Sequence, residues 1–422
     1  MTSQVTERIA PLGKAFLSAT GEQTVFALAG FVGQVFLARH LTQDQYGLFA
    51  LASTFLAVAA NLHVTLWGEP VVVYGKSRFP DLTVGYLRRV FQLQLYFGIA
   101  LTTIAVFIMA LTLRGEAWFS TSLAMALALP FWLSLNFIRR AVYVFPAPHL
   151  AALGGIVYAG VFLGALFSFY KCSFLQSDTA FLAMFLGSLG GVLVILRLRP
   201  LSIQQKTNLY KKEIFTLHFS YGRWVVPALV LSSFASNLPY WALGYAHSIE
   251  DVARLRVLAL LYMPLTLITA ALNQLVLSLL ASVRAKPRTF VSRLKASVGL
   301  IIAFTLPFSL AMFFWGQSVL GTFFGAQYAN IPPIYLSLLA PIPVLLGIAG
   351  MMGTALRALN QPQRVLALHL SSSALALFLA TILPIKMGLP GALLSLTLLF
   401  LLQAISGAYL VIDTIKQIRN GG

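Results

Sequence analysis

The sequence contains few charged residues. Asp, Glu, Lys and Arg make up only 9% of its 422 residues, whereas a soluble domain carries about 25%. Acidic residues are the scarcest, with 11 Asp and Glu against 29 Lys and Arg. This deficit excludes a water-soluble fold, and the 59% of hydrophobic residues excludes a disordered chain. The composition therefore predicts an integral membrane protein.

Cysteine and the common catalytic motifs are almost absent. Cys172 is the single cysteine, which excludes an internal disulfide framework and a multi-cysteine metal site. The sequence contains no GxxxxGK[ST] phosphate loop, no HExxH zinc motif and no dinucleotide fingerprint. We therefore expect no cofactor, no metal, no ATP hydrolysis by the chain itself and no enzymatic activity.

Long apolar runs dominate what is present. A helix needs about 20 apolar residues to cross the hydrocarbon core, and its backbone polar groups must be hydrogen-bonded internally. Twelve such runs follow one another with short connections, which predicts an all-α integral membrane fold. The expected spans are residues 15–38, 46–75, 90–113, 117–138, 149–170, 176–196, 217–246, 252–283, 296–315, 331–356, 365–385 and 389–412.

The basic residues lie mostly on one side of these spans. Lys and Arg in short loops stay in the cytoplasm. With a cytoplasmic N-terminus, 22 of them fall on the inner side, six on the outer side, and Arg223 alone lies within a span. This bias predicts cytoplasmic N- and C-termini. It also accounts for the net charge of +18 without a nucleic acid partner, and attraction to anionic membrane lipids is a second effect.

Two short segments recur in the second half of the chain. An acidic turn that leads into an apolar helix occurs at 41–51 and again at 247–257, and Arg140 with Ala141 matches Arg357 with Ala358. The offsets of 206 and 217 both place the seventh span over the first. We therefore expect two six-helix lobes, 1–200 with helices 1–6 and 201–422 with helices 7–12, in a parallel pseudo-repeat around a central cleft. Chance similarity between apolar helices is the alternative.

Four segments resemble a known family. They read DQYGL at 44–48, FGAQYA at 324–329, ALRALNQP at 355–362 and GLPGA at 388–392. In this order and spacing they are similar to the polysaccharide transport family, the Wzx-type or O-antigen flippases of the multidrug, oligosaccharidyl-lipid and polysaccharide exporter superfamily. The first half departs from the family pattern before the sixth span, where residues 176–180 read QSDTA in place of a Gly-x-x-Gly segment.

The resemblance implies a flippase of the bacterial cytoplasmic (inner) membrane. Such a protein moves lipid-linked oligosaccharide repeat units of the undecaprenyl-diphosphate type from the cytoplasmic to the outer leaflet by alternating access. The product serves cell-surface polysaccharide biosynthesis, such as O-antigen, lipopolysaccharide or exopolysaccharide. A monomer is expected, with membrane lipids, a proton or sodium ion and polysaccharide assembly proteins as further partners. A proton- or sodium-coupled small-molecule exporter of the multidrug type is the alternative.

The family's cleft is lined chiefly by helices one, two, seven and eight, so polar residues are expected there. Thr54, Asn61, Thr65 and Glu69 of span two share one helical face about 80° wide. Similar stripes occur in span seven, with Ser233, Asn237 and Tyr240, and in span eight, with Thr266, Thr269 and Asn273. We predict that Asn61, Thr65, Asn237 and Asn273 line the substrate path. Hydrogen bonding between helices is the alternative.

Three ionisable side chains lie deep within the predicted spans, namely Glu22, Glu69 and Arg223. Because inserting a charge at mid-membrane costs about 3 kcal/mol, such a group faces a cavity or a partner. We predict that Arg223 binds an anionic lipid phosphate, while Glu22 or Glu69 responds to substrate or protons. A Glu22–Arg223 ion pair with a structural role is the alternative.

Aromatic and basic residues complete the predicted site. Trp67 and Trp224 flank the charges and could stack on sugar rings, although Trp near a helix end also serves as an interfacial anchor. Arg39, Arg254 and Arg256 are expected at the outer mouth.

Several further residues predict bending, packing or titration. Prolines in the cleft helices should bend them, and glycine pairs should let helices approach closely. His63 and His218 titrate near neutrality unless the fold simply hydrogen-bonds them. The prolines are Pro70, Pro227, Pro239 and Pro264, and the glycine pairs are Gly160/Gly164 and Gly187/Gly191.

Overall fold

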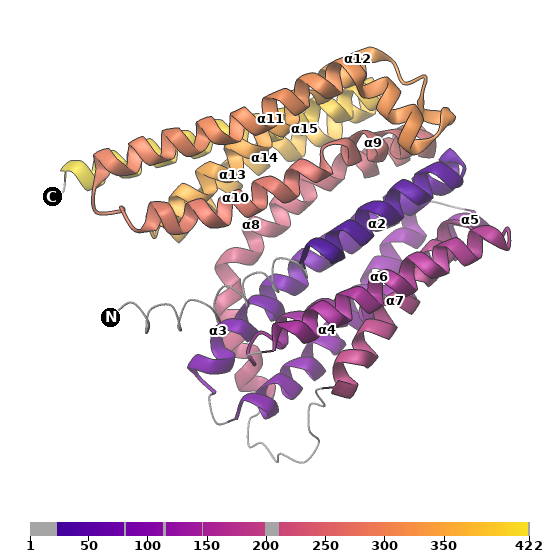
Figure 1. Ribbon diagram of the computed structural model, residues 1–422, viewed down its shortest axis with the longest axis horizontal. Helices are drawn as coiled ribbons and strands as arrows, with labels where there is room; N and C mark the ends of the chain where they lie inside the picture. Colours follow the sequence, from indigo (N-terminus) through magenta and orange to yellow (C-terminus); the bar gives the residue numbers. More distant parts are fainter. Residues whose placement is uncertain (1–22, 80–81, 113–114, 146, 199–210, 421–422) are drawn as a thin grey trace, which may run out of the picture. The chain divides into compact units, whose positions relative to one another are not determined.

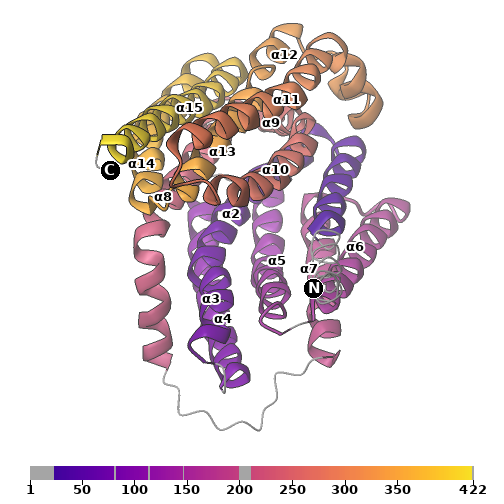
Figure 2. The same cartoon turned by 60° about the vertical axis from the view of Figure 1, so that its left-hand side comes forward.

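The computed structural model describes residues 23–79, 82–112, 115–145, 147–198 and 211–420 (Figures 1 and 2). All regular elements in these ranges are helical. The chain divides into two compact units, Met1–Val226 and Pro227–Gly422. The division falls inside helix α8 (Lys211–Ala246), and the first turns of α8 bond to the first unit through His218.

The first unit is a bundle built around α5 (Glu116–Ala141). This helix contacts α2 (Gln43–His63), α4 (Thr83–Thr112) and α7 (Ser177–Leu198), and α6 (Pro148–Lys171) packs along α7. A helix at 23–40 precedes α2, and the π-helical turn η1 (Val64–Gly68) joins α2 to α3 (Glu69–Ser77). Tyr86, Met125, Phe137 and Phe181 are fully buried in its core.

In the second unit, α13 (Ile342–Ala358) contacts α10 (Met263–Ala281), α11 (Pro287–Phe324) and α15 (Leu389–Asn420). Helix α14 (Pro362–Met387) packs along α15, and both figures show these helices side by side. The shorter elements are α9 (Ile249–Leu261), η2 (Ala326–Tyr328) and α12 (Pro333–Leu339). The core of this unit contains Leu280, Phe290, Ile301, Met351 and Leu356.

The helices match the predicted spans. Within the described ranges, ten helices are long and apolar enough to cross a membrane, and each coincides with a predicted span. The other two predicted spans correspond to the helix at 23–40 and to α8. The prediction of an all-α, multi-pass membrane fold is therefore confirmed.

Two spans that were predicted as continuous are interrupted. The span at 252–283 breaks at Tyr262, between α9 and α10, and the span at 331–356 breaks at Ala340 and Pro341, between α12 and α13. Proline causes both breaks, since Pro264 and Pro341 lack an N–H and clash with the carbonyl four residues earlier. Pro227 and Pro239, in contrast, lie inside a continuous α8.

The recurring sequence segments begin and end corresponding helices. Thr42 caps α2 by accepting a hydrogen bond from the Gln45 amide, and Ser248 caps α9 by accepting one from the Asp251 amide. Each cap precedes an acidic first turn, which favours the helix N-terminus. Helix α5 ends at Ala141 and α13 ends at Ala358, the positions that the second offset relates.

Two of the family segments place glycine where a helix ends. Gly325 follows α11 with a φ of 100°, and Gly388 follows α14 with a φ of 61°. Other residues rarely adopt a positive φ, so glycine at these positions lets the chain leave the helix without strain. The FGAQYA and GLPGA segments thus have a structural reason for their glycines.

Helices α6 and α7 approach closely through glycine. A Cβ atom on Gly187 would lie 3.0 Å from the Tyr158 carbonyl oxygen, and one on Gly191 would lie 2.9 Å from the Gly154 carbonyl oxygen. The packing role predicted for Gly187/Gly191 is confirmed. The same role for Gly160/Gly164 is wrong, because a Cβ atom at either position would meet nothing within 4 Å.

Replacing Gly191 with alanine should lower the free energy of unfolding by about 1–3 kcal/mol, because the Gly154 carbonyl belongs to the backbone and cannot turn aside. Gly160→Ala on the facing helix is the matched control and should be neutral or stabilising by up to about 1 kcal/mol. Thermal unfolding of the detergent-solubilised variants measures both. Equal losses would contradict this account of the contact.

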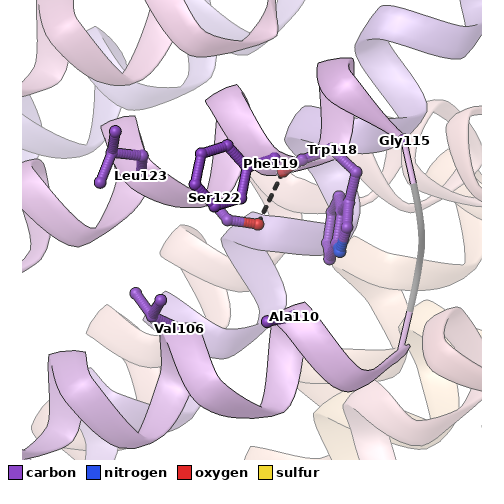
Figure 3. Close-up of a pocket in the computed structure, with 7 residues that line it drawn as sticks. All are labelled: Val106, Ala110, Gly115, Trp118, Phe119, Ser122 and Leu123. Carbon is purple, nitrogen blue, oxygen red and sulfur yellow. Dashed lines mark hydrogen bonds between the residues drawn. The ribbon is translucent and has the colours of Figure 1, made fainter.

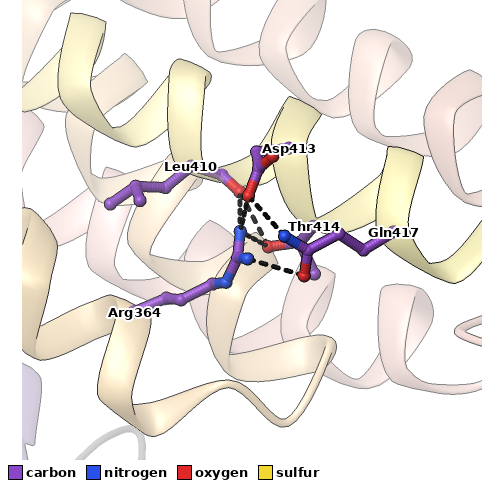
Figure 4. A network of polar contacts seen from close by, with 5 residues as sticks. All are labelled: Arg364, Leu410, Asp413, Thr414 and Gln417. Carbon is purple, nitrogen blue, oxygen red and sulfur yellow. Dashed lines mark hydrogen bonds and ion pairs between the residues drawn. The ribbon is translucent and has the colours of Figure 1, made fainter.

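In the second unit, a polar network joins the start of α14 to the end of α15 (Figure 4). Arg364 Nη1 donates to the Leu410 carbonyl at 3.1 Å and to the Thr414 hydroxyl at 2.8 Å, and Nη2 donates to Gln417 Oε1 at 2.8 Å. The same guanidinium lies 2.7 Å from Asp413 Oδ2. One arginine side chain thus donates hydrogen bonds to acceptors along two turns of α15.

Replacing Arg364 with methionine should destabilise the second unit by about 1–3 kcal/mol, because the charge-assisted bonds to α15 disappear. Asp413→Asn removes the charge of the partly exposed ion pair but leaves an oxygen that can still accept from Gln417, so it should cost less than about 1 kcal/mol. Hydrogen exchange at the end of α15 measures the difference. A larger cost for Asp413→Asn would mean that the ion pair, and not the set of hydrogen bonds, holds the helices together.

Candidate functional site

The candidate site lies in the first unit, where the second span changes its winding. In η1 the Glu69 amide bonds to the Val64 carbonyl five residues earlier, so the turn is wider than an α-helical turn. Pro70 follows immediately and has no N–H to donate to the Leu66 carbonyl, the partner that α-helical geometry would give it. Such π turns are frequent at functional sites because they free backbone groups and reorient side chains.

His218 of α8 supplies a donor to this carbonyl. Its Nδ1 lies 2.8 Å from the Leu66 oxygen, and its Nε2 lies 2.7 Å from the Tyr86 hydroxyl of α4. A carbonyl can only accept, so Nδ1 carries a proton, and in the neutral ring Nε2 accepts from Tyr86. The imidazole is buried and joins three helical elements that are far apart in sequence.

A second buried histidine, His63, lies at the start of the same π turn. Its Nε2 is 2.9 Å from Gln94 Oε1, and Gln94 Nε2 donates to the Ser134 hydroxyl at 3.2 Å. All three side chains are buried. These bonds link α2, α4 and α5. Within the described ranges, Nδ1 of His63 has no hydrogen-bond partner.

Trp67 lies inside the π turn and packs against these residues. Its ring centroid is 5.3 Å from that of His218 and 5.9 Å from that of Phe97, and the side chain is 2% exposed. The ring is therefore part of the core of the first unit and offers no open face for a sugar. Its indole N–H has no partner among the described residues.

The structure describes two of the three predicted ionisable residues. Glu69 is the first residue after η1 and is half-buried, and Arg223 is exposed on α8. Gly222, next to Arg223, packs on the π turn, since a Cβ atom there would lie 2.8 Å from a Leu66 methyl group. Glu69 therefore directly follows the turn in sequence, and Arg223 lies on the helix that packs against the turn at Gly222. Glu22 lies outside the described residues, and so does the side chain of Trp224.

The polar stripe of the second span does not form one open face. Thr54 and Thr65 are buried, and their hydroxyls donate within their own helix, to the Leu51 and Asn61 carbonyls. Asn61 is exposed. The extra residue of the π turn shifts Glu69 away from the face that an uninterrupted α-helix would give it.

The predicted asparagines of the second unit occupy different environments. Asn237 is half-buried and donates to the Ser233 carbonyl of its own helix at 2.8 Å. Asn273 of α10 lies against α13, where its amide nitrogen would be 2.9 Å from a Cβ atom on Gly350. Its Oδ1 is buried without a hydrogen-bond partner among the described residues.

The three predicted outer-mouth arginines also differ. Arg39 is exposed at the end of the helix at 23–40. Arg254 pairs with Asp251 at 3.0 Å, one turn earlier in α9, and Arg256 hydrogen-bonds the buried Tyr240. Arg254 and Arg256 are therefore engaged with side chains of their own unit.

Arg139, one of the basic residues on the predicted inner side, has a buried side chain. The guanidinium carbon lies 3.7 Å from the centre of the Phe26 ring, which in turn packs 4.7 Å from the Tyr158 ring. His63 and His218 were noted only as candidates. The Glu69-Pro70 pair inside an apolar span was the available signal for the π turn.

A metal site has no support in the described ranges, where no three His, Cys, Asp or Glu side chains gather closely enough to bind an ion. The site is instead a hydrogen-bonded aromatic cluster around a widened turn, with Glu69 directly after the turn and Arg223 on the helix that packs against it.

The sequence profile of one family, described as polysaccharide biosynthesis protein, matches residues 36–333. No curated protein matches the chain in sequence.

Solved structures share the fold. An inward-facing multidrug resistance MATE family transporter of the MOP superfamily superposes with a TM-score of 0.74 at 13% identity, covering 95% of this chain and 99% of that one. The lipid II flippase MurJ in an inward closed conformation gives 0.72 at 13% identity, covering 94% and 88%. A MOP superfamily transporter from Pyrococcus furiosus gives 0.67 at 14% identity, covering 97% and 96%. At these identities the likeness establishes the fold alone.

Proposed function

This chain belongs to the polysaccharide biosynthesis protein family, and on that basis we propose that it is a flippase for lipid-linked oligosaccharides. It moves repeat units on an undecaprenyl-diphosphate type carrier from the cytoplasmic to the outer leaflet of the bacterial inner membrane by alternating access. The units serve assembly of a cell-surface polysaccharide such as O-antigen or exopolysaccharide. Both termini are cytoplasmic, and the protein acts as a monomer, alongside polysaccharide assembly proteins.

The family match over residues 36–333 is the observation that supports this proposal most strongly. The multi-pass helical fold is compatible with it, because MOP superfamily transporters share that fold. In the first unit, Glu69 directly follows the π turn, and Arg223 lies on the helix that packs against the turn at Gly222. We assign Arg223 to the carrier phosphate, since a guanidinium binds phosphate oxygens in a bidentate fashion. Glu69 and Glu22 are the groups that respond to substrate or to a coupling ion.

The test is the location of the glycolipid in cells that lack the protein. We expect lipid-linked sugars to accumulate on the cytoplasmic leaflet of inner-membrane vesicles, where an added glycosidase reaches them only from that side. Expression of the wild-type chain should restore their appearance on the outer leaflet. Normal leaflet distribution in the deletion strain would refute the proposal.

A proton- or sodium-coupled exporter of small molecules is the competing function, and it predicts a different result. Purified protein in proteoliposomes would then expel an organic cation when an ion gradient is imposed. Lipid-linked sugars would keep their normal distribution in the deletion strain. The two measurements together separate the two functions.

A further inference from the structure

An apolar pocket lies between the end of α4 and the start of α5 in the first unit (Figure 3). Its volume is about 250 Å³. Val106 and Ala110 line it from α4, and the α5 residues face them from the opposite side. The complete lining is Val106, Ala110, Gly115, Trp118, Phe119, Ser122 and Leu123.

The lining offers no charge to a ligand. Ser122 has the only hydroxyl among these side chains, and it donates to the Trp118 carbonyl at 2.7 Å, as the dashed line in Figure 3 shows. A sugar or phosphate placed here would lose its water without gaining equivalent hydrogen bonds, which costs several kcal/mol for a neutral group and more for an ion. The pocket therefore selects a hydrocarbon.

The pocket opens on a surface that faces lipid. Phe119 and Leu123, at its edge, are 64% and 59% exposed, and Phe107, on the neighbouring turn of α4, is 66% exposed. All three residues lie in helices that are long and apolar enough to span a membrane. On helices of this kind, exposed large apolar side chains are expected to contact acyl chains.

We propose that this pocket binds one acyl chain of a bilayer phospholipid. Phospholipid acyl chains surround this surface in the membrane. They are therefore more concentrated at the opening of the pocket than any other ligand. A methylene group takes up about as much space as a water molecule, roughly 30 Å³, so the pocket holds on the order of eight methylenes. Gly115, in the connection between the two helices, marks the end of the pocket nearest the membrane surface.

The bound chain replaces side-chain contacts that α4 and α5 lack at this point. Trp118 is 3% exposed and closes the end of the pocket next to Gly115, so a chain that enters between Phe119 and Leu123 meets a wall of ring and methyl groups. An occupied pocket gains dispersion contacts that an empty one forgoes. The site is independent of the proposed function, because it is separate from the π turn and contains no charged group.

Photolabelling tests the proposal. The protein is placed in nanodiscs of phosphatidylcholine in which one acyl chain bears a diazirine, and the labelled peptides are mapped by mass spectrometry after irradiation. We expect labelling of residues 106–123 to exceed that at Leu193, an equally exposed lipid-facing residue on α7, by several-fold. Labelling that simply follows exposure across both sites would overturn the proposal.

Two tryptophan variants sharpen the test. Ala110→Trp fills the pocket from an exposed position and should abolish the excess labelling, while Ala100→Trp, exposed elsewhere on α4, should preserve it. Equal labelling of the two variants would overturn the assignment of the pocket. Displacement of the label by a polyprenyl phosphate, but not by unlabelled phosphatidylcholine, would identify the carrier as the occupant and would also overturn it.

Discussion

Replacing Arg223 with alanine should reduce transport of lipid-linked sugars roughly ten- to hundredfold while folded protein remains in the membrane. Arg223 is exposed on α8, so the substitution opens no buried cavity. A hydrogen bond to an ionised group contributes about 1.5–3 kcal/mol, which corresponds to a roughly ten- to hundredfold loss of transport when a phosphate loses its guanidinium. Transport of the radiolabelled glycolipid in proteoliposomes measures the effect.

Two further variants separate phosphate recognition from a structural ion pair. Arg223→Lys retains the charge but loses the fork of parallel donors, so transport should fall to an intermediate rate. Arg288→Ala, at an exposed position at the start of α11, removes a cation from elsewhere in the protein and should leave transport unchanged. Loss of folded protein on Arg223→Ala would instead favour the ion pair with Glu22, and unchanged transport would remove Arg223 from the site.

Replacing His218 with alanine should lower the free energy of unfolding by about 2–5 kcal/mol, because two buried groups, the Leu66 carbonyl and the Tyr86 hydroxyl, lose their partner. Tyr86→Phe removes a single hydrogen bond and should cost only about 1 kcal/mol. Thermal unfolding in detergent measures both values. Similar costs for the two variants would show that the Leu66 carbonyl needs no partner.

The Pro70→Ala variant tests why this histidine is required. Alanine restores the N–H that an α-helical turn would donate to Leu66, so the carbonyl no longer depends on His218. In a double-mutant cycle, the cost of His218→Ala should therefore fall by about 1 kcal/mol or more in the Pro70→Ala background. Equal costs in the two backgrounds would mean that proline and histidine act independently.

The membrane-spanning helices were predictable because the hydropathy of a span is the sum over consecutive residues. Any run of about 20 apolar residues must satisfy its backbone within a helix, whatever its neighbours are. The starts of some helices also depend only on neighbouring residues, since Thr42 and Ser248 cap the helices that begin directly after them. The spans were predicted from their apolar composition. A helix that loses a single backbone hydrogen bond at a proline keeps that composition, so the interruptions at Tyr262 and at Ala340 and Pro341 were not predicted.

The candidate site was harder to predict than the fold. Trp67 was expected to meet sugars but is enclosed by His218, Phe97 and Phe215. Arg139, counted only as one of the inner basic residues, is buried over the Phe26 ring. Spacing along one helix gives the direction of a side chain only while the winding stays regular, and the π turn at Val64–Gly68 breaks that regularity.

Apolar length, basic asymmetry and four short segments determined, by themselves, that this protein spans the membrane with many helices and resembles polysaccharide transporters. Only the tertiary structure decided that the freed Leu66 carbonyl meets His218, which lies 152 residues further along the chain. The physical reason is the range of each interaction. Burial in lipid depends on consecutive residues, whereas a hydrogen bond between helices depends on how each helix is rotated and shifted against the others.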